Sequence, residues 1–315
     1  MKFSDRIAES IVRVAGLLIV CLGAATSVAN ADGRYSTGYF AERVITTLTA
    51  EQALAAMDRG FITSEQYVRI LLRRIERYPE LNALVHVNRH AAIASAREAD
   101  RERAAGVSKP LLGLPVVIKD SFNTADLPTT VGTPSLLGFQ PDSNAAIVDA
   151  LLEAGAIILA KGNLHELQAG FLTNNPSLGV AYNPYGRGLS PGGSSGGNAA
   201  AVSARLAPLA IGADTAGSIR APAALTGTTG FRPTSGRYRM DGIAPLAPTF
   251  DSAGPMARSV RDLALADAVI TGDSIKLDAI NLKGLRIGVP RGFFRLAVVY
   301  CRLNSDETYE VLNRW

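Results

Sequence analysis

Short runs of consecutive apolar residues alternate along the chain with segments whose apolar positions recur at helical spacing. Three runs have the length of a buried strand and cover residues 114–118, 156–160 and 206–211. A fourth segment of strand length, residues 285–289, is interrupted by Arg286. Strands that are apolar at every position belong to sheets covered on both faces, and their alternation with helices is typical of the α/β class. We therefore predict an α/β fold in which helices cover both faces of the sheet.

The segments between these runs carry the signals that start and end helices. Thr49 is followed three positions later by Gln52, and Thr63 by Gln66, which is the spacing of a capping box. Ser143 is expected to cap a further helix. We predict helices over residues 49–60, 63–78, 90–105 and 143–153.

The first 31 residues have the pattern of a secretory signal peptide. Basic residues precede the apolar stretch 14–28, and Ala29-Asn30-Ala31 forms a small-x-small cleavage site before Asp32. An uncleaved membrane anchor is the alternative, but the stretch is short for a span of about 20 residues. We expect residues 1–31 to be removed and residues 32–315 to be exported, to the periplasm or beyond, without a membrane anchor.

Composition narrows the function classes. The 315 residues are 47% hydrophobic and 19% charged, which excludes a disordered protein, a coiled coil and a collagen-like chain. The net charge is +4 and the basic residues are scattered, so we expect no nucleic-acid partner. Two cysteines exclude a disulfide scaffold and a cysteine-based zinc module. Cys21 would leave with the leader, and Cys301 would then remain as a lone thiol.

Glycine, serine and threonine become dense between residues 170 and 240, where the backbone is expected to approach a ligand closely. Two serines, Ser194 and Ser195, lie within the glycine loop 192–197, and Ser218 follows a second turn of small residues. A flexible turn and a helix cap are the plain alternatives for these serines. Neither a phosphate-binding loop nor a Gly-x-Ser-x-Gly elbow is present in these two segments.

A base for a serine nucleophile must come from elsewhere in the chain. The three histidines are His86 and His90, expected around a helix start, and His165, which lacks the second histidine of a zinc-protease helix. Lys119 directly follows the apolar run 114–118. An exposed charge is the ordinary role for such a lysine, but burial would lower its pKa and make it a possible base. Serine can be activated by lysine.

Taken together, these segments resemble the amidase signature family of serine hydrolases. The matching motifs are residues 113–120 (GLPVVIKD), the glycine loop 192–197, residues 214–220 (DTAGSIR) with Pro222-Ala223, and residues 230–234 (GFRPT). The similarity covers roughly residues 50 to 290. It implies a mixed β-sheet sandwiched between helices and an amidase domain that extends over residues 32–315.

The resemblance implies a Ser-cisSer-Lys triad. Lys119 matches the family lysine, Ser194 the bridging serine with its cis peptide bond, and Ser218 the nucleophile; the neighbouring Ser195 does not match the bridge. Ser218 would attack an amide carbonyl and form an acyl-enzyme that water hydrolyses. No metal and no cofactor are expected.

The turn before Ser218 would supply the oxyanion hole. The backbone N–H groups expected there are those of Thr215, Ala216, Gly217 and Ser218. Asp214 and Arg220 are interpreted as structural supports of this turn. Ala213 and Ala216 stand where the family commonly has threonine and glycine, and Ala216 would be strained if its position required a positive φ.

The substrate is expected to be a small-molecule amide. Residues 163–167, with Asn175-Pro176 and Asn183-Pro184, resemble the subgroup that includes indoleacetamide and mandelamide hydrolases, which favours an aryl-acetamide. A peptide amidase and an aliphatic amidase remain alternatives. The amidotransferase component of the transamidosome shares the motifs, but an exported protein would not meet charged tRNA.

Family members usually extend well beyond this length. Residues 285–291 are still family-like, whereas the following tail is less typical, so we expect the amidase domain to be incomplete at its C-terminus. Two other functions therefore stay open, a catalytically inactive remnant and a small-molecule binding protein. The sequence does not predict the oligomeric state.

Overall fold

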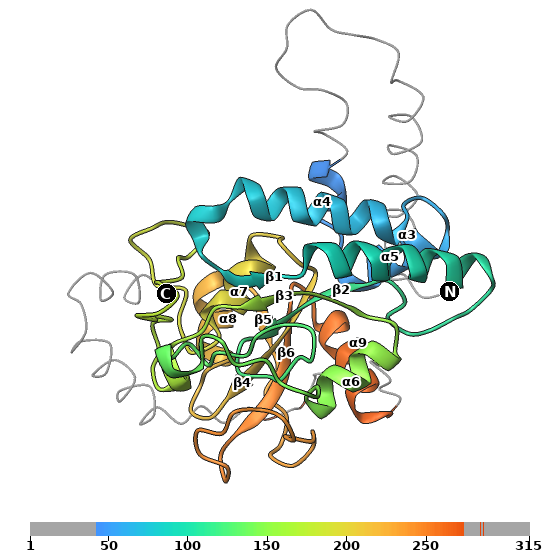
Figure 1. The fold of residues 1–315 in the computed structure, drawn as a ribbon. Coiled ribbons are helices and arrows are strands. Elements are labelled where there is room, and N and C mark those ends of the chain that lie inside the picture. The colour runs from blue at the N-terminus through green and yellow to red at the C-terminus, as the bar shows by residue number, and fades with distance from the viewer. Residues whose placement is uncertain (1–41, 274–283, 285, 287–315) are drawn as a thin grey trace, which may run out of the picture. The chain divides into compact units, whose positions relative to one another are not determined.

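A six-stranded sheet lies at the centre of the computed structural model, which describes residues 42–273, 284 and 286 (Figure 1). The strands are β1 (Leu84–Val87), β2 (Pro115–Lys119), β3 (Ile157–Gly162), β4 (Leu209–Asp214), β5 (Thr229–Gly230) and β6 (Ser252–Ala257). Their order across the sheet is β1-β3-β2-β4-β6-β5. Strand β2 pairs in parallel with β3 and β4, whereas the β1–β3, β4–β6 and β5–β6 pairs are antiparallel. The sheet is therefore mixed, as the family resemblance implies.

The apolar runs form the middle of this sheet. All residues of β2, β3, β4 and β6 are buried. The run 206–211 becomes a strand only from Leu209, so its predicted start is wrong. The N–H of Leu206 donates to the carbonyl of Ala201 in the preceding helix, and Pro208 has no N–H for a ladder bond. The fourth predicted strand, residues 285–289, lies outside the described residues except for Arg286, and the predicted signal peptide lies outside them entirely.

Helices cover both faces of the sheet. The α-helices are α3 (Ala50–Asp58), α4 (Ser64–Arg77), α5 (Arg89–Ala104), α6 (Ala146–Glu153), α7 (Gly196–Ser203), α8 (Arg220–Thr226) and α9 (Val260–Thr271), with short 3-10 turns at Pro79–Leu81, Pro134–Leu136 and Glu166–Gln168. Figure 1 shows α7 and α8 on one side of the sheet and α6 and α9 on the other. Within the described part of the chain, no helix has both the length and the apolar character needed to cross a membrane.

The helix starts depend on how the first N–H groups are satisfied. Thr49 and Thr63 form the predicted capping boxes with Gln52 and Gln66. The predicted cap at Ser143 is wrong, because α6 begins after Ala145 and has no side-chain cap. The N–H groups of Ala145 and Ala146 instead donate to backbone carbonyls of neighbouring loops, at Asn123 and Asp241. Tertiary contacts thus replace the local cap.

Several elements were not expected from the apolar pattern. His86 lies inside β1 rather than at a helix start, while His90 lies in the first turn of α5. The glycine loop leads directly into α7, whose residues are all buried except Ser203. A Cβ on Gly197 would stand 2.4 Å from the carbonyl oxygen of Asn163, just after β3. Small residues therefore let α7 lie against the sheet and fix the position of the serines that precede it.

Helices α3 and α9, far apart in the sequence, are tied together. The Asp262 carboxylate of α9 accepts a 2.9 Å hydrogen bond from the N–H of Glu51 in α3. Arg258, just before α9, donates to the carbonyl of Leu48 and to carbonyls of Val202 and Ala207. The contacts to Glu51 and Leu48 join segments more than 200 residues apart in the sequence.

A buried ion pair lies beside β2. Lys161 Nζ is 3.2 Å from Asp120 Oδ1, and both side chains are inaccessible to solvent. The same ammonium donates to two carbonyls and two threonine hydroxyls within the segment 122–129. Removing one partner of such a pair leaves an uncompensated buried charge.

We therefore expect Lys161→Met to lower the free energy of unfolding by about 3–5 kcal/mol. The matched control is Lys109→Met, which breaks the partly exposed pair of Lys109 with Glu102 and should cost less than about 1 kcal/mol. Urea unfolding of both variants measures the difference. Equal losses would show that the buried pair contributes no more than the surface pair.

Candidate active site

Lys119 ends strand β2 at the centre of the sheet, and its side chain is completely buried. Its amine donates a 2.8 Å hydrogen bond to Ser194 Oγ, with the carbonyl of Ala213 at 3.4 Å. The hydroxyl of Ser195 donates instead to that same carbonyl, at 3.1 Å. Of the two adjacent serines, Ser194 is therefore the one that Lys119 contacts, and Lys119 is not the exposed charge that a strand end usually carries.

The surroundings of Lys119 favour its neutral form. Burial lowers the pKa of the Lys119 amine to about 7, although the negative charges of Asp214 and Asp251 oppose the shift. Within the described residues Lys119 forms no ion pair with a carboxylate. A lysine with this pKa exchanges its proton near neutral pH, as a general base must.

Close backbone packing holds the loop that carries Ser194. The Gly193–Ser194 peptide bond is cis, as the resemblance implies. A Cβ on Gly193 would lie 2.6 Å from the carbonyl carbon of Phe171, so only glycine fits against this neighbouring segment. Thr173 donates its hydroxyl to the carbonyl of Gly192 and accepts the N–H of Gly196. The loop is thus braced on both sides of Ser194.

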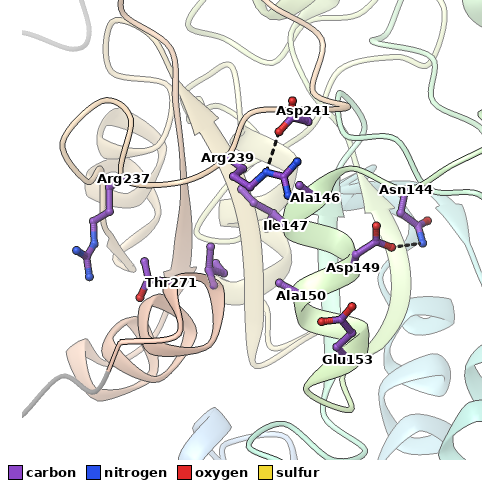
Figure 2. A pocket seen from close by; sticks show the side chains of 11 residues that line it. Asn144, Ala146, Ile147, Asp149, Ala150, Glu153, Arg237, Arg239, Asp241 and Thr271 are labelled. Carbon is purple, nitrogen blue, oxygen red and sulfur yellow. Dashed lines mark hydrogen bonds and ion pairs between the residues drawn. The ribbon is translucent and has the colours of Figure 1, made fainter.

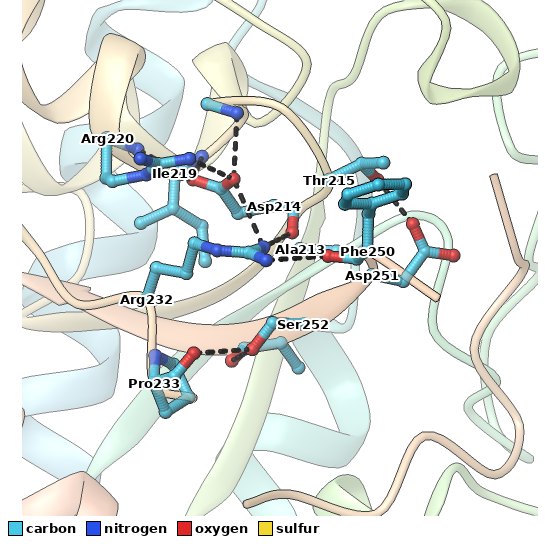
Figure 3. A network of polar contacts seen from close by, with 12 residues as sticks. Ala213, Asp214, Thr215, Ile219, Arg220, Arg232, Pro233, Phe250, Asp251 and Ser252 are labelled. Carbon is cyan, nitrogen blue, oxygen red and sulfur yellow. Dashed lines mark hydrogen bonds and ion pairs between the residues drawn. The ribbon is translucent and has the colours of Figure 1, made fainter. Parts of the chain in front are cut away.

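The turn that carries Ser218 is organised around one carboxylate (Figure 3). Asp214 accepts the N–H groups of Gly217 at 2.8 Å and Ile219 at 3.1 Å, and it pairs with the guanidinium of Arg220. Burial alone would raise the pKa of Asp214, but the bonds from Arg220 and Ile219 outweigh burial and lower it. The interpretation of Asp214 and Arg220 as supports of the turn agrees with these contacts.

Ser218 lies next to the glycine loop. Its carbonyl accepts a 3.1 Å hydrogen bond from the N–H of Ser195, and 5% of its surface is exposed. The structure therefore brings Lys119, Ser194 and Ser218, predicted from three distant motifs, into one neighbourhood. Sequence reasoning did not single out two further residues here: Asp251, which accepts the hydroxyl of Thr215, and Phe171, beside the turn.

The predicted oxyanion donors separate into two groups. The N–H of Gly217 is directed to the Asp214 carboxylate, so its prediction as an oxyanion donor is wrong in this arrangement. Among residues 42–273, the N–H groups of Thr215, Ala216 and Ser218 have no protein acceptor. The positive φ of the turn, 136°, falls on Gly217, and Ala216 has no positive φ, so the alanine is not strained.

The histidines take no part in contacts with the serine hydroxyls in the described structure. The backbone N–H of His165 donates to the carbonyl of Ser194. Its ring nitrogen Nδ1 accepts weakly from the N–H groups of Leu172 and Asn174, at 3.4 and 3.5 Å. His165 thus links the loop 165–174 to the Ser194 loop through its backbone. No cluster of three or more potential metal ligands occurs among the described residues.

A separate hollow of about 530 Å³ lies between α6 and α9 (Figure 2). Asp149, Glu153 and Asp241 line it together with Arg237 and Arg239, and Figure 2 shows the contact of Arg239 with Asp241. None of the described lining residues is a serine, cysteine, histidine or lysine. The hollow is therefore distinct from the group of Lys119, Ser194 and Ser218.

Comparisons with known proteins identify the family to which the chain is similar. A family model described as Amidase matches residues 66–313. Indoleacetamide hydrolase of Agrobacterium vitis is 43% identical over 82% of this chain and 54% of its own length. Mandelamide hydrolase of Pseudomonas putida is 42% identical over 77% of this chain and 49% of its own length. A component of the glutamyl-tRNA(Gln) amidotransferase of Halorhodospira halophila is 42% identical over 78% of this chain and 54% of its own length.

Solved structures show the same likeness. The peptide amidase of Stenotrophomonas maltophilia superposes with a TM-score of 0.68 and 40% identity, covering 71% of this chain and 48% of that chain. The chain spans about half the length of the curated relatives it matches.

The positive φ of Gly217 generates a test of the turn. We expect Gly217→Ala to lower the free energy of unfolding by about 1–2 kcal/mol, because an alanine is strained at this φ. Ala216→Gly is the matched control and should cost less than about 1 kcal/mol, since it removes one methyl without a change in backbone region. Thermal unfolding compares the two. A Gly217→Ala variant as stable as Ala216→Gly would contradict the described backbone.

Proposed function

The chain belongs to the amidase family, and we propose that it hydrolyses a carboxamide to a carboxylic acid and ammonia or an amine through Ser218, Ser194 and Lys119. The observation that carries the proposal is the 2.8 Å hydrogen bond between the buried Lys119 amine and Ser194 Oγ. Lys119 contacts Ser194, and the Ser194 loop in turn contacts the segment that carries Ser218. A buried lysine and two serines in this arrangement have the parts of a proton relay.

The relay supplies the proton transfers of acyl transfer. Neutral Lys119 accepts the proton of Ser194, and Ser194 accepts the proton of Ser218 as its Oγ attacks the amide carbonyl. The carbonyl oxygen becomes an oxyanion, which the free N–H groups of Thr215, Ala216 and Ser218 can approach. One such donor contributes about 3 kcal/mol in related chemistry. The proton then passes through Ser194 to the leaving nitrogen, and water hydrolyses the acyl-enzyme.

An apolar surface beside the turn supports an aryl-acetamide as the substrate. The ring of Phe171 lies 3.8 Å from the position of a Cβ on Gly217 and is 43% exposed. An exposed aromatic ring next to the proposed acyl site gains free energy when a second apolar group covers it. With a signal peptide over residues 1–31, the enzyme would act outside the cytoplasm on amides that reach it there.

The triad is tested by matched serine variants. We expect Ser218→Ala to abolish ammonia release and labelling by a fluorophosphonate, and Ser194→Ala to lower both at least about 100-fold, the usual scale of a lost proton-transfer group. Ser195→Ala should cost far less, because the Ser195 hydroxyl bonds to a strand carbonyl and not to Lys119. Mass spectrometry of the labelled peptide locates the adduct.

The pH dependence of the same assay tests the base. Lys119 must be neutral to accept a proton, so labelling should rise as the pH increases through about 7. Well-folded protein that forms no adduct at any pH would contradict an active centre and leave the remnant and the binding protein as the functions to pursue. In a binding protein, Ser218→Ala would leave ligand affinity intact.

The substrate class is tested by Phe171→Ala. We expect KM for phenylacetamide to rise about tenfold, equal to about 1.4 kcal/mol of lost apolar contact, while KM for acetamide stays nearly unchanged. Phe139→Ala is the matched control, because Phe139 is a phenylalanine of similar exposure, 45%, and lies outside the site. An equal change for both amides would argue against a contact between Phe171 and the acyl group.

A further inference from the structure

Two carboxylates, those of Asp214 and Asp251, flank the turn that carries Ser218. Two arginines near this turn, Arg220 and Arg232, both pair with Asp214. Asp251 forms no ion pair with any lysine or arginine among the described residues, and its acceptors are filled by neutral donors. The negative charge of Asp214 is therefore compensated locally, whereas that of Asp251 is not.

Asp251 occupies a position that joins three segments of the site (Figure 3). It directly precedes strand β6 and is nearly buried, with 9% of its surface exposed. Its carboxylate accepts the N–H groups of Leu246 at 2.9 Å and Ala247 at 3.0 Å. It also accepts the hydroxyl of Thr215, the first residue after β4 in the Ser218 turn. One carboxylate thus fixes a loop, the start of β6 and the start of the turn.

The negative charge of Asp251 also favours the protonated form of Lys119, the proposed base. Asp214 and Asp251 are the two groups whose negative charge raises the pKa of Lys119 against the effect of burial. The titratable and charged groups on the elements around Lys119 fall into two sets. Asp120 pairs with Lys161, and Asp214 pairs with Arg220 and Arg232. His165 and Asp251 form no such pair among the described residues. Of the two carboxylates that raise the pKa of Lys119, Asp214 has the larger effect and lies in contact with Arg220 and Arg232, whereas Asp251 forms no ion pair among the described residues.

We propose that Asp251 is a positioning residue of the Ser218 centre, which holds the Thr215 end of the turn and supplies the uncompensated negative charge that acts on Lys119. The proposal rests on the triad proposed above. It assigns two separable tasks to one side chain: the hydrogen bond to Thr215 depends on an acceptor oxygen, whereas the effect on Lys119 depends on charge. Asp251→Asn removes the charge and keeps one acceptor oxygen for Thr215, while its amide NH2 replaces the oxygen that accepts from Leu246 and Ala247. Thr215→Val removes the hydrogen bond and keeps the charge.

The first experiment measures Lys119 directly and requires no activity. The chain has only six lysines, so NMR titration of protein labelled at lysine Cε follows each one, and Lys119→Arg assigns the Lys119 signal. We expect Asp251→Asn to lower the pKa of Lys119 by about one pH unit, because a nearby negative charge that favours the ammonium is lost. Lys161, whose neighbours are Asp120 and Asp126, should titrate unchanged and serves as the internal control.

Asp241→Asn is the matched surface control, since Asp241 is exposed and pairs with Arg239 away from the site. It should move neither lysine. A Lys119 titration that is the same in Asp251→Asn as in the unmodified protein would overturn the proposal. Equal displacement of Lys119 and Lys161 would also overturn it, because that result indicates a general opening of the structure rather than a local charge.

The second experiment tests the positioning task with the fluorophosphonate. We expect Thr215→Val to slow labelling of Ser218 about tenfold, the effect of one misaligned hydrogen bond, and to leave the Lys119 titration unchanged. Labelling at the unmodified rate would overturn the positioning role. If Asp251→Asn does not fold, the labelling rate of Thr215→Val alone decides whether the proposal stands. Absence of labelling in the folded, unmodified protein would contradict the proposed function instead, and the NMR titration would still decide the role of Asp251.

Discussion

The site depends on the burial of one amine at the end of the central strand. Lys119 is shielded from solvent and has no carboxylate partner in the described structure, and its close contact is the hydroxyl of Ser194. A charged ammonium would be costly in such surroundings, whereas a neutral amine needs only a hydrogen-bond partner. Strand β2 provides this environment because β3 and β4 flank it on both sides. The position of the proposed base is therefore a property of the sheet and not of a loop.

Close approach of backbone segments is the second condition. Gly193 leaves no room for a side chain against Phe171, and Gly197 leaves none against Asn163. These contacts place the Ser194 loop between the segment after β3 and helix α7. Within the Ser218 turn, the Asp214 carboxylate collects the N–H groups of Gly217 and Ile219. The N–H of Ser195 donates to the carbonyl of Ser218, so these close backbone contacts hold the two serine-bearing segments side by side.

Local signals predicted some elements well and failed at others for identifiable reasons. The capping boxes at Thr49 and Thr63 and the apolar run of β2 are complete within a few residues, so the sequence alone is sufficient there. Strand β6 reads Ser-Ala-Gly-Pro-Met-Ala and has no β-branched residue, so its burial follows only from its neighbours. The first N–H groups of helix α6 donate to carbonyls of loops that are distant in the sequence, so the residues around the helix start do not predict where it begins.

In the candidate site, too, some residues could be predicted from local sequence and others depend on tertiary contacts. The motifs of Lys119, Ser194 and Ser218 have a recognisable order in the sequence. The proximity of Asp251 to Thr215, and of Phe171 to Gly217, arises only from the tertiary structure. The direction of the Gly217 N–H was likewise missed, because it depends on where the Asp214 side chain folds back. Side-chain contacts across the turn decide these roles, and they are not encoded in residue spacing.

The tie between α3 and α9 has a consequence for how the protein is made. Asp262 and Arg258 supply acceptors and donors for Glu51 and Leu48, so α3 cannot complete its packing until the ribosome has released the segment around α9. Closing so long a loop is entropically slow, and the early helices must wait with apolar faces exposed during synthesis. The order of translation thus leaves the N-terminal helices prone to aggregation until the segment around α9 has been made.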